Sequence, residues 1–235
     1  MITLHHCIDA RSFRPLWALE EVGVPYELKV LPFPPRFLQR EYLEINPLGT
    51  IPAFFDGDAP RMTESAAICQ YLGDRYARGA QGVAVEEPAY GAYLNWLHFG
   101  EATLTFPQTL VLRYRRLEPP ERRVPQAADD YAKWFLARAR AITPALEQEF
   151  ICAGRFTMAD ISISYALMLA QQLGLFEALE PAARGDAERR QPRQPRRAHT
   201  NLSSGTAGSS AMNRSMRARR SSGIGTARRY PGDAG

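Results

Sequence analysis

The strongest constraint on the fold lies at the start of the chain, where a helical pattern separates two short β-prone runs. Residues 2–6 form a short β-prone run, and residues 26–31 predict a second strand. Between them, residues 13–22 place apolar side chains at helical spacing, with Pro15 in the first turn and Gly23 as a stop signal. A helix between two short strands closes as a right-handed βαβ unit, so we expect parallel strands.

A second group of elements follows an irregular helical stretch. Residues 51–55 predict a strand, and the turn at residues 56–58 folds it back onto a short strand near residues 61–62. Residues 63–76 then predict a helix. The order βαβ followed by ββα indicates an α/β domain over residues 1–80.

The rest of the apolar sequence predicts helices alone. Residues 81–88 are weakly patterned and end in a proline, which is typical of a linker. Residues 89–183 predict an all-helical domain. Its helices are expected over residues 89–114, 127–150 and 158–173.

The start of the last of these helices carries a capping box. Thr157 is placed to accept hydrogen bonds from first-turn N–H groups, and Asp160 is placed to bond back to the Thr157 N–H. Such a cap contributes about 1 kcal/mol. We therefore interpret Asp160 as a capping residue and not as a catalytic one.

The net charge of +4 combines two unlike parts. Residues 184–235 hold 12 arginines, no lysine and three acidic residues, so they carry +9 and residues 1–183 carry −5. This Arg, Ser and Gly-rich tail has too few large apolar side chains to offset ordering entropy, so we expect disorder there. We hypothesise that a frameshift near residues 184–190 of a GC-rich gene produced the tail, which would leave the helical domain truncated.

Composition excludes several other classes of protein. No apolar run is long enough to cross a bilayer, and residues 1–10 lack a secretory pattern, so we expect a cytoplasmic protein without membrane contact. Because the basic charge is confined to the tail, it does not indicate specific nucleic-acid binding. Cys7, Cys69 and Cys152 form no metal-ligand pattern, and we expect no metal site.

Two neighbouring segments carry the chemistry for binding a small peptide. Pro52 stands where a strand begins, and a cis bond there would turn Ile51 outward to offer its N–H and C=O groups to an extended peptide. Where the following helix begins, its N–H groups and the Ser65 hydroxyl suit a carboxylate, and the Glu64 side chain suits an ammonium group.

These segments resemble the glutathione transferase family, in its bacterial, cytosolic type. The resemblance covers about residues 1–180, and the matching segments are residues 4–6, 11–21, 46–52, 63–68 and 156–160. It implies a thioredoxin-like first domain that binds glutathione, a helical second domain that binds an electrophile, and a homodimer. It implies no metal.

The activity that the resemblance implies is transfer of the glutathione thiolate to apolar or aromatic electrophiles, as in detoxification. A glutathione-dependent peroxidase or thiol reductase is the alternative within the fold. The other alternative is a glutathione-transferase-like protein that binds its ligand without catalysis.

The resemblance also assigns the residues that bind glutathione. Ile51, beside a cis Pro52, would pair with the cysteinyl backbone. Glu64 and Ser65 would hold the γ-glutamyl amine and carboxylate. Two polar residues of the irregular helical stretch would meet the glycyl end, namely Gln39 and Arg36.

The residue that activates the thiol would stand near the start of the first helix. Ser12 is our first choice, since its hydroxyl would donate to the thiolate. His6 stands at the usual tyrosine position of the family. Cys7 is a further alternative, through a mixed disulfide with glutathione.

Two arginines near this helix start are candidates for a second role. Arg11 and Arg14 would each supply positive charge to the thiolate, or would pair with Glu20 or Glu21 within the same domain.

The electrophile is expected to bind between the domains, against the first long helix. That helix offers aromatic side chains with a few polar groups, which suits apolar or aromatic molecules. The candidates are Tyr93, Trp96, Phe99, Arg113 and Tyr114.

Overall fold

A computed structural model describes residues 1–77 and 79–189 of the chain. The predicted disorder and the frameshift hypothesis concern a tail that lies, from residue 190 onward, outside the described residues. None of the helices in the described ranges combines the length and apolar content that a bilayer crossing requires.

The first domain is built on a three-stranded sheet, as the sequence predicts. Strand β1 (Ile2–His6) pairs in parallel with β2 (Tyr26–Val30), and helix α1 (Phe13–Val22) connects them. Strand β3 (Ala53–Asp56) pairs antiparallel with β1, which gives the order β2-β1-β3. The fourth, short strand is reduced to one bridge between Phe54 and Met62.

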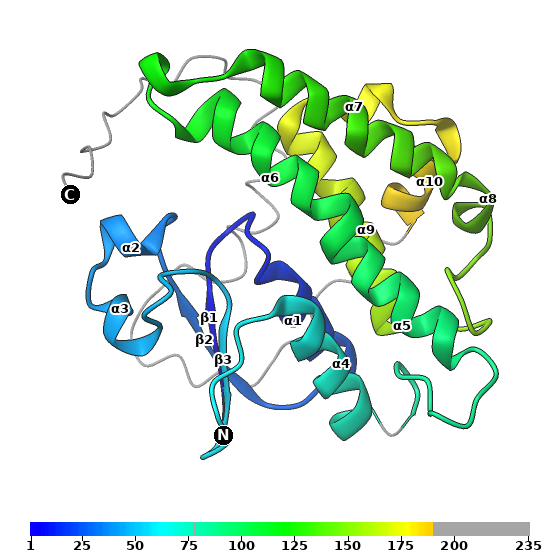
Figure 1. Cartoon of the computed structure of the whole chain (residues 1–235). Helices are drawn as coiled ribbons and strands as arrows, with labels where there is room; N and C mark the ends of the chain where they lie inside the picture. Colours follow the sequence, from blue (N-terminus) through cyan, green and yellow to red (C-terminus); the bar gives the residue numbers. More distant parts are fainter. Residues whose placement is uncertain (78, 190–235) are drawn as a thin grey trace.

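Helices cover both sides of this sheet (Figure 1). Helix α4 (Ser65–Tyr76) packs beside α1, between the sheet and the second domain. The short helices α2 (Pro35–Leu38) and α3 (Tyr42–Ile45) lie on the other side. The fold is therefore a thioredoxin-like sheet domain followed by a helical region.

The regular elements in the described part of the second domain are all helices. Its elements are α5 (Tyr90–His98), π-helix η1 (Phe99–Thr105), α6 (Phe106–Leu112), π-helix η2 (Arg113–Leu117), 3₁₀-helix η3 (Pro120–Arg122), α7 (Pro125–Ala141), α8 (Thr143–Leu146), α9 (Met158–Leu173), 3₁₀-helix η4 (Phe176–Ala178) and α10 (Pro181–Arg189). The long helix predicted over residues 127–150 is interrupted near Ile142 and ends at Leu146. Pro144 sits in the first turn of α8, because proline cannot continue a preceding helix.

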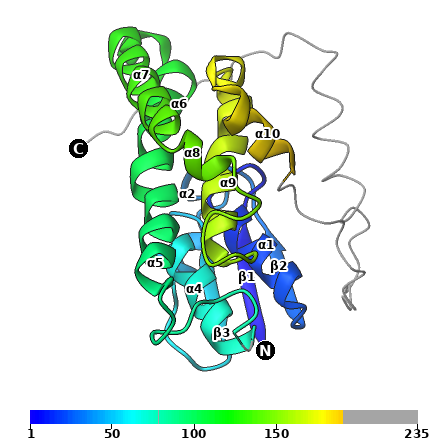
Figure 2. The ribbon, with the colours of Figure 1, turned by 90° about the vertical axis from the view of Figure 1, so that its right-hand side faces the viewer.

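Helix α9 is the central element of the second domain, between α5–η1 and α1 (Figure 2). Its predicted bounds and its capping box are both confirmed. The Thr157 N–H donates to Asp160 over 2.8 Å, and the Ile151 N–H donates to the same carboxylate over 2.9 Å. One buried core includes apolar residues of α9, β1 and α4, so the two domains pack as one body.

The crossing of η1 and α9 depends on a glycine. A Cβ atom on Gly100 would lie 2.4 Å from the Ser162 hydroxyl oxygen and 2.6 Å from the Ser162 carbonyl carbon. Ser162 in turn donates a hydrogen bond of 2.7 Å to the Leu97 carbonyl. The two helices therefore approach so closely that only glycine fits at this position.

Helix α10 lies where the sequence predicts the start of the disordered tail, so that predicted boundary is wrong. The helix runs through residue 184, where the sequence suggested that ordered structure ends. Ala183 and Ala187 are buried against the core. Small alanines supply the contact here, so the scarcity of large apolar residues was a misleading signal.

Candidate functional site

The candidate site lies at one end of the sheet, where three segments meet. In the β1–β3 ladder, His5 pairs with Ala53, so the following residue of β1 ends beside Pro52. The loop of residues 7–12 leaves β1 at this point and enters α1. The N-terminus of α4 is joined to α1 through a hydrogen bond from Arg14 to Ser65.

The backbone before β3 is held by two buried side chains. The Ile51–Pro52 peptide bond is cis, as predicted. The preceding Thr50 carbonyl accepts hydrogen bonds from the Tyr42 hydroxyl at 2.7 Å and from the Asn46 amide at 2.8 Å. Sequence reasoning missed the anchoring role of Tyr42 and Asn46. Ile51 itself lies outside the ladder, at the end of the sheet.

Glu64 and Ser65 begin α4 in different surroundings. Glu64 is the exposed N-cap residue, with extended backbone angles. Ser65 is buried, and its hydroxyl donates to Glu101 over 3.3 Å and accepts from Arg14 over 3.2 Å. The hydroxyl is thus engaged within the protein. A ligand carboxylate at this end would meet the first-turn N–H groups of the helix.

The Ser12 side chain is buried and hydrogen-bonded within the protein. Ser12 is fully buried, and its hydroxyl accepts from the Cys7 N–H over 3.1 Å. The same hydroxyl lies 2.9 Å from His6 Nδ1 and 3.3 Å from the Cys7 carbonyl. The Ser12 hydroxyl is thus bonded to groups of the protein itself, and its role in activating the thiol stays a prediction. Ser12 ties the loop to β1.

The two alternatives to Ser12 are also uncharged and buried. Burial raises the pKa of the Cys7 thiol to about 12, and Cys7 has no exposed surface, so it stays a thiol. Burial lowers the pKa of His6 to about 4, so the ring is neutral near pH 7. Both side chains are therefore neutral near pH 7, and their roles as alternatives to Ser12 stay predictions.

The accessible groups of the loop are different ones. Ile8 is 55% exposed, and the Arg11 side chain is 34% exposed. Arg11 pairs with Glu101 of η1 at 2.7 Å, so the alternative that it pairs with Glu20 or Glu21 is wrong. Those two carboxylates accept hydrogen bonds from aromatic side chains of the first domain instead. Arg11 is thus a cation at the start of α1 that solvent reaches.

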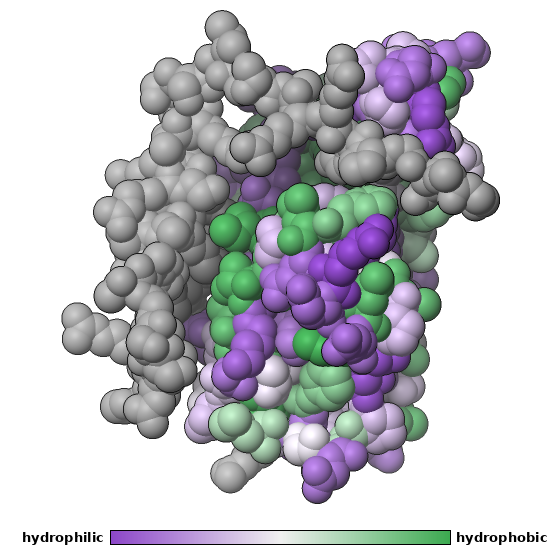
Figure 3. Space-filling model, turned by 90° about the vertical axis from the view of Figure 1, so that its left-hand side faces the viewer, coloured by the Kyte–Doolittle hydropathy of each residue, from purple (hydrophilic) through white to green (hydrophobic). Residues whose placement is uncertain are grey.

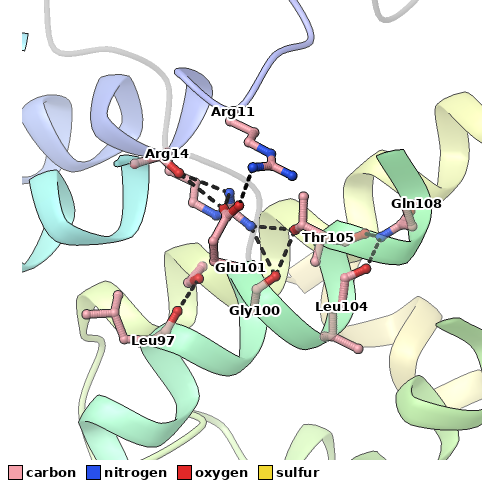
Figure 4. Close-up of polar contacts among 11 residues, drawn as sticks. Arg11, Arg14, Leu97, Gly100, Glu101, Leu104, Thr105 and Gln108 are labelled. Carbon is pink, nitrogen blue, oxygen red and sulfur yellow. Dashed lines mark hydrogen bonds and ion pairs between the residues drawn. The ribbon is translucent and has the colours of Figure 1, made fainter. Parts of the chain in front are cut away.

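Arg14 is the centre of a buried polar cluster that joins the two domains (Figure 4). Its side chain has no exposed surface, and its carbon Cζ lies 4.2 Å from the centre of the Tyr165 ring. It forms an ion pair with Glu101. Its other hydrogen-bond acceptors are Ser65, the Gly100 carbonyl at 3.2 Å and Thr105 at 2.6 Å.

Glu101, which joins Arg11, Arg14 and Ser65 in this cluster, is a further residue that sequence reasoning missed. It is the one carboxylate in the mostly apolar run over residues 99–112, and this is the signal that pointed to a partner.

Arg36 and Gln39 lie on and beside α2, with exposed side chains. A Cβ atom on Gly49 would lie 2.7 Å from Arg36 Cβ, so α2 packs against the turn that leads to Ile51. Gly49 has a φ of +61°, which the turn requires and glycine adopts without strain. Arg36 therefore stands close to the turn before the cis-proline segment, and the contact of Arg36 and Gln39 with the glycyl end stays a prediction.

Tyr93, predicted to line the electrophile site, belongs to the core instead. It has no exposed surface, and burial raises the pKa of its hydroxyl well above the usual range. Asp74 and Cys69 of α4 are among the groups that act on it. The face of α5 that bears Tyr93 thus packs against the first domain.

The other four predicted electrophile residues are spread along the helical rod from α5 to η2. Trp96 and Phe99 contact each other edge to face, with ring centres 5.5 Å apart. Phe99 also lines a hollow of about 340 Å³ along α5 and η1. Arg113 pairs with Glu118 at the far end of this helical rod, beside Tyr114. The sequence spacing predicts instead that all of these residues line one side of the electrophile site.

Exposed apolar side chains gather instead around the sheet end and α2–α3. Figure 3 shows this face, where hydrophobic and hydrophilic surface alternate. The exposed large apolar residues of this region are Ile8, Val30, Phe33, Phe37, Leu38, Leu43, Ile45 and Leu48. Ile8 and Phe33 follow the ends of the parallel strands β1 and β2, so they flank the candidate site.

Comparison with known proteins agrees with this geometry. Residues 10–75 match the family model of the glutathione S-transferase N-terminal domain. Glutathione S-transferase 3 of Schizosaccharomyces pombe is 38% identical over 104 residues, which cover 44% of this chain. The comparisons support the glutathione S-transferase family. The chain spans less than half, 43%, of the length of that curated relative. Because that relative is fungal, the bacterial type of glutathione S-transferase stays a prediction.

Solved glutathione S-transferase structures match over both domains. The enzyme from Actinobacillus pleuropneumoniae is 26% identical, with a TM-score of 0.61 over 80% of this chain and 92% of that one. Glutathione transferase URE2P6 of Phanerochaete chrysosporium, in complex with oxidized glutathione, is 25% identical, with a TM-score of 0.62 over 80% and 94% of the two chains. These matches cover the sheet domain and the helical region together.

Proposed function

We propose that this protein binds glutathione at the end of its sheet and transfers the glutathione thiolate to an apolar or aromatic electrophile. The observation that carries the proposal is the meeting of the cis Ile51–Pro52 segment, the exposed Glu64 and the start of α1 at one edge. Solved relatives whose names state a bound glutathione support the choice of peptide.

Glutathione would be bound by backbone groups as well as by side chains. The Ile51 N–H and C=O groups would pair with the cysteinyl residue, because Tyr42 and Asn46 fix the peptide that precedes them. Glu64 would hold the γ-glutamyl ammonium, and the N–H groups that begin α4 would hold its carboxylate. Arg36 and Gln39 would meet the glycyl carboxylate.

Arg11 replaces Ser12 as our proposed partner of the thiolate. A free cysteine thiol has a pKa of about 8.5, and a nearby cation lowers it. Arg11 is the cationic side chain that the loop exposes, and it stands at the N-terminus of α1, where the helix dipole also favours negative charge. The nucleophile would then be the sulfur of glutathione itself.

The electrophile would lie over the exposed apolar side chains that flank this position. Ile8 and Phe33 are 55% and 46% exposed. Both side chains are apolar, so they suit contact with an apolar ring. A homodimer, a cytoplasmic location and a role in detoxification are further parts of this proposal, drawn from the family.

A glutathione-binding protein without catalysis is the second candidate. It is favoured by the burial of Ser12, which leaves the loop without an exposed hydroxyl donor at that position. A thiol reductase that uses Cys7 is disfavoured by the high pKa and complete burial of that thiol.

Two measurements on the full chain test the proposal. Retention on immobilised glutathione and a conjugation rate with a chromogenic aromatic electrophile above that of buffer are expected. Retention without a rate would favour the non-catalytic candidate. A folded protein that shows neither would overturn both candidates.

A further inference from the structure

The Glu101 carboxylate is the point at which three parts of the candidate site meet. Its Oε1 atom lies 2.7 Å from an Arg11 nitrogen, at the loop before α1. Its Oε2 atom accepts from Arg14 and, over 3.3 Å, from the Ser65 hydroxyl at the start of α4. Glu101 itself belongs to η1 of the second domain (Figure 4).

The geometry of η1 fixes where this carboxylate lies. The Gly100 carbonyl beside it accepts from both Arg14 and the Thr105 hydroxyl, at 3.2 and 2.7 Å. Gly100 is also pressed against Ser162 of α9. π-Helical turns are rare and often occur at functional positions. The backbone that carries Glu101 is therefore held from two sides.

The Glu101 carboxylate pairs with two guanidinium groups. Arg14 is completely buried, whereas Arg11 keeps about a third of its side chain exposed. The remaining titratable groups that face this cluster in the described residues come from the loop, α4 and α9, namely Asp9, Cys69 and Tyr165. Counted with Asp9, the two arginines and the two carboxylates have a formal net charge of zero, and the accessible positive charge of the cluster is on Arg11.

We propose that Glu101 is a positioning residue of the glutathione site, which acts from the second domain by holding Arg11 toward the thiol and, through Ser65, the start of α4 at the γ-glutamyl end. Arg14 is the buried anchor that keeps the carboxylate in place. This inference rests on the proposed function, because it names what sets the geometry of that same site.

Positioning and simple charge predict opposite results. If Glu101 acted only as a nearby negative charge, its removal would leave more positive potential at the sulfur and would lower the pKa of the bound thiol. If Glu101 holds Arg11 in place, its removal frees a flexible side chain and raises that pKa. The sign of the shift therefore separates the two roles.

The test measures the pKa of the thiol of bound glutathione. The titration is monitored through the ultraviolet absorbance of the thiolate, as the difference between the protein with and without glutathione. Glu101→Gln is expected to raise this pKa by about one unit, which corresponds to a tenfold change in the ionisation constant of the thiol. Arg11→Gln is expected to raise it equally, and the double variant is expected to raise it no further. Arg11→Lys, which keeps the charge, is expected to restore part of the loss.

Two variants keep the test decisive. Glu101→Asp keeps the negative charge in the cluster for buried Arg14 but shortens the side chain and weakens its hold on Arg11, so it is expected to raise the thiol pKa even where Glu101→Gln does not fold. Glu118→Gln removes a carboxylate that pairs with Arg113 at the far end of the same rod, and it is the matched control, expected to leave the pKa unchanged.

The outcomes are distinguishable. A lowered or unchanged thiol pKa in folded Glu101→Gln or Glu101→Asp, with wild-type glutathione binding intact, would overturn the positioning role alone. Absence of glutathione binding by the wild-type protein would overturn the proposed function itself, and the inference with it.

Discussion

The hydroxyl of Tyr42 donates a 2.7 Å hydrogen bond to the carbonyl of Thr50, and this bond orients the peptide that enters the cis Ile51–Pro52 segment. Tyr42 is almost wholly buried, so the bond is shielded from water. The residue therefore acts on the site without touching a ligand. Its contribution is measurable because a phenylalanine keeps the ring and removes the hydroxyl alone.

Tyr42→Phe is expected to weaken glutathione binding about fivefold, since one neutral hydrogen bond contributes about 1 kcal/mol. Isothermal titration calorimetry measures the change. Tyr26→Phe is the matched control, because its hydroxyl bonds to Glu20, away from the site, and it is expected to leave the affinity unchanged. Equal affinities for wild type and Tyr42→Phe would contradict the anchoring role.

Gly100→Ala is expected to destabilise the protein by about 2–3 kcal/mol, because the added methyl group would overlap the Ser162 backbone. Urea unfolding followed by circular dichroism measures this change. Gly91→Ala in the same helical rod is the control, since no atom lies within 4 Å of its Cβ position. That control is expected to gain about 0.5 kcal/mol. Similar stabilities of the two variants would refute the close approach of η1 to α9.

Asp160→Ala is expected to cost about 3 kcal/mol of stability, because the N–H groups of Thr157 and Ile151 would lose their buried acceptor. The exposed Asp130→Ala on α7 provides the comparison, expected within about 0.5 kcal/mol of wild type. Thermal unfolding distinguishes them. A catalytic role for Asp160 would instead appear as lost activity in a protein of unchanged stability.

His6 is expected to make stability depend on pH below neutrality. Its pKa is about 4 in the folded state and near 6.5 when unfolded, so between these values the unfolded state binds the extra proton. Stability is therefore lost as pH falls from about 6.5 toward 4, by about 2 kcal/mol at pH 4.5.

Urea unfolding at pH 7 and pH 4.5 measures this dependence. His6→Gln is expected to show a smaller loss of stability than wild type over that interval, whereas His98→Gln, which changes an exposed histidine, is expected to match wild type. An equal loss in His6→Gln would show that the ring is not held neutral by the fold.

The sequence allowed prediction of features that depend on neighbours along the chain. The order of strands and helices, the bounds of α9 and its capping box all rest on local spacing, and the structure confirms them. The cis bond at Pro52 was likewise signalled by a proline at the start of a strand. Local signals suffice where partners lie within a few residues.

Features that depend on distant partners escaped prediction. Arg14 and Glu101 are 87 positions apart, so charge patterning along α1 pointed to nearer carboxylates instead. Ser12 has a residue type suited to activating a thiol, but the burial that commits its hydroxyl arises from the path of the loop. Tyr93 lies on a helix that is apolar on more than one side, so spacing did not reveal which side faces the core.

The most direct test of the account is the affinity of the full chain for reduced glutathione, compared between wild type and Glu64→Gln by calorimetry. The Glu64 side chain is exposed, so its replacement is expected to leave the fold intact and to weaken binding at least tenfold through the lost ammonium contact. Glu86→Gln, an exposed change outside the site, is expected to bind as wild type does. Wild-type binding that is unaffected by Glu64→Gln, or no binding by the folded wild-type protein, would contradict the account.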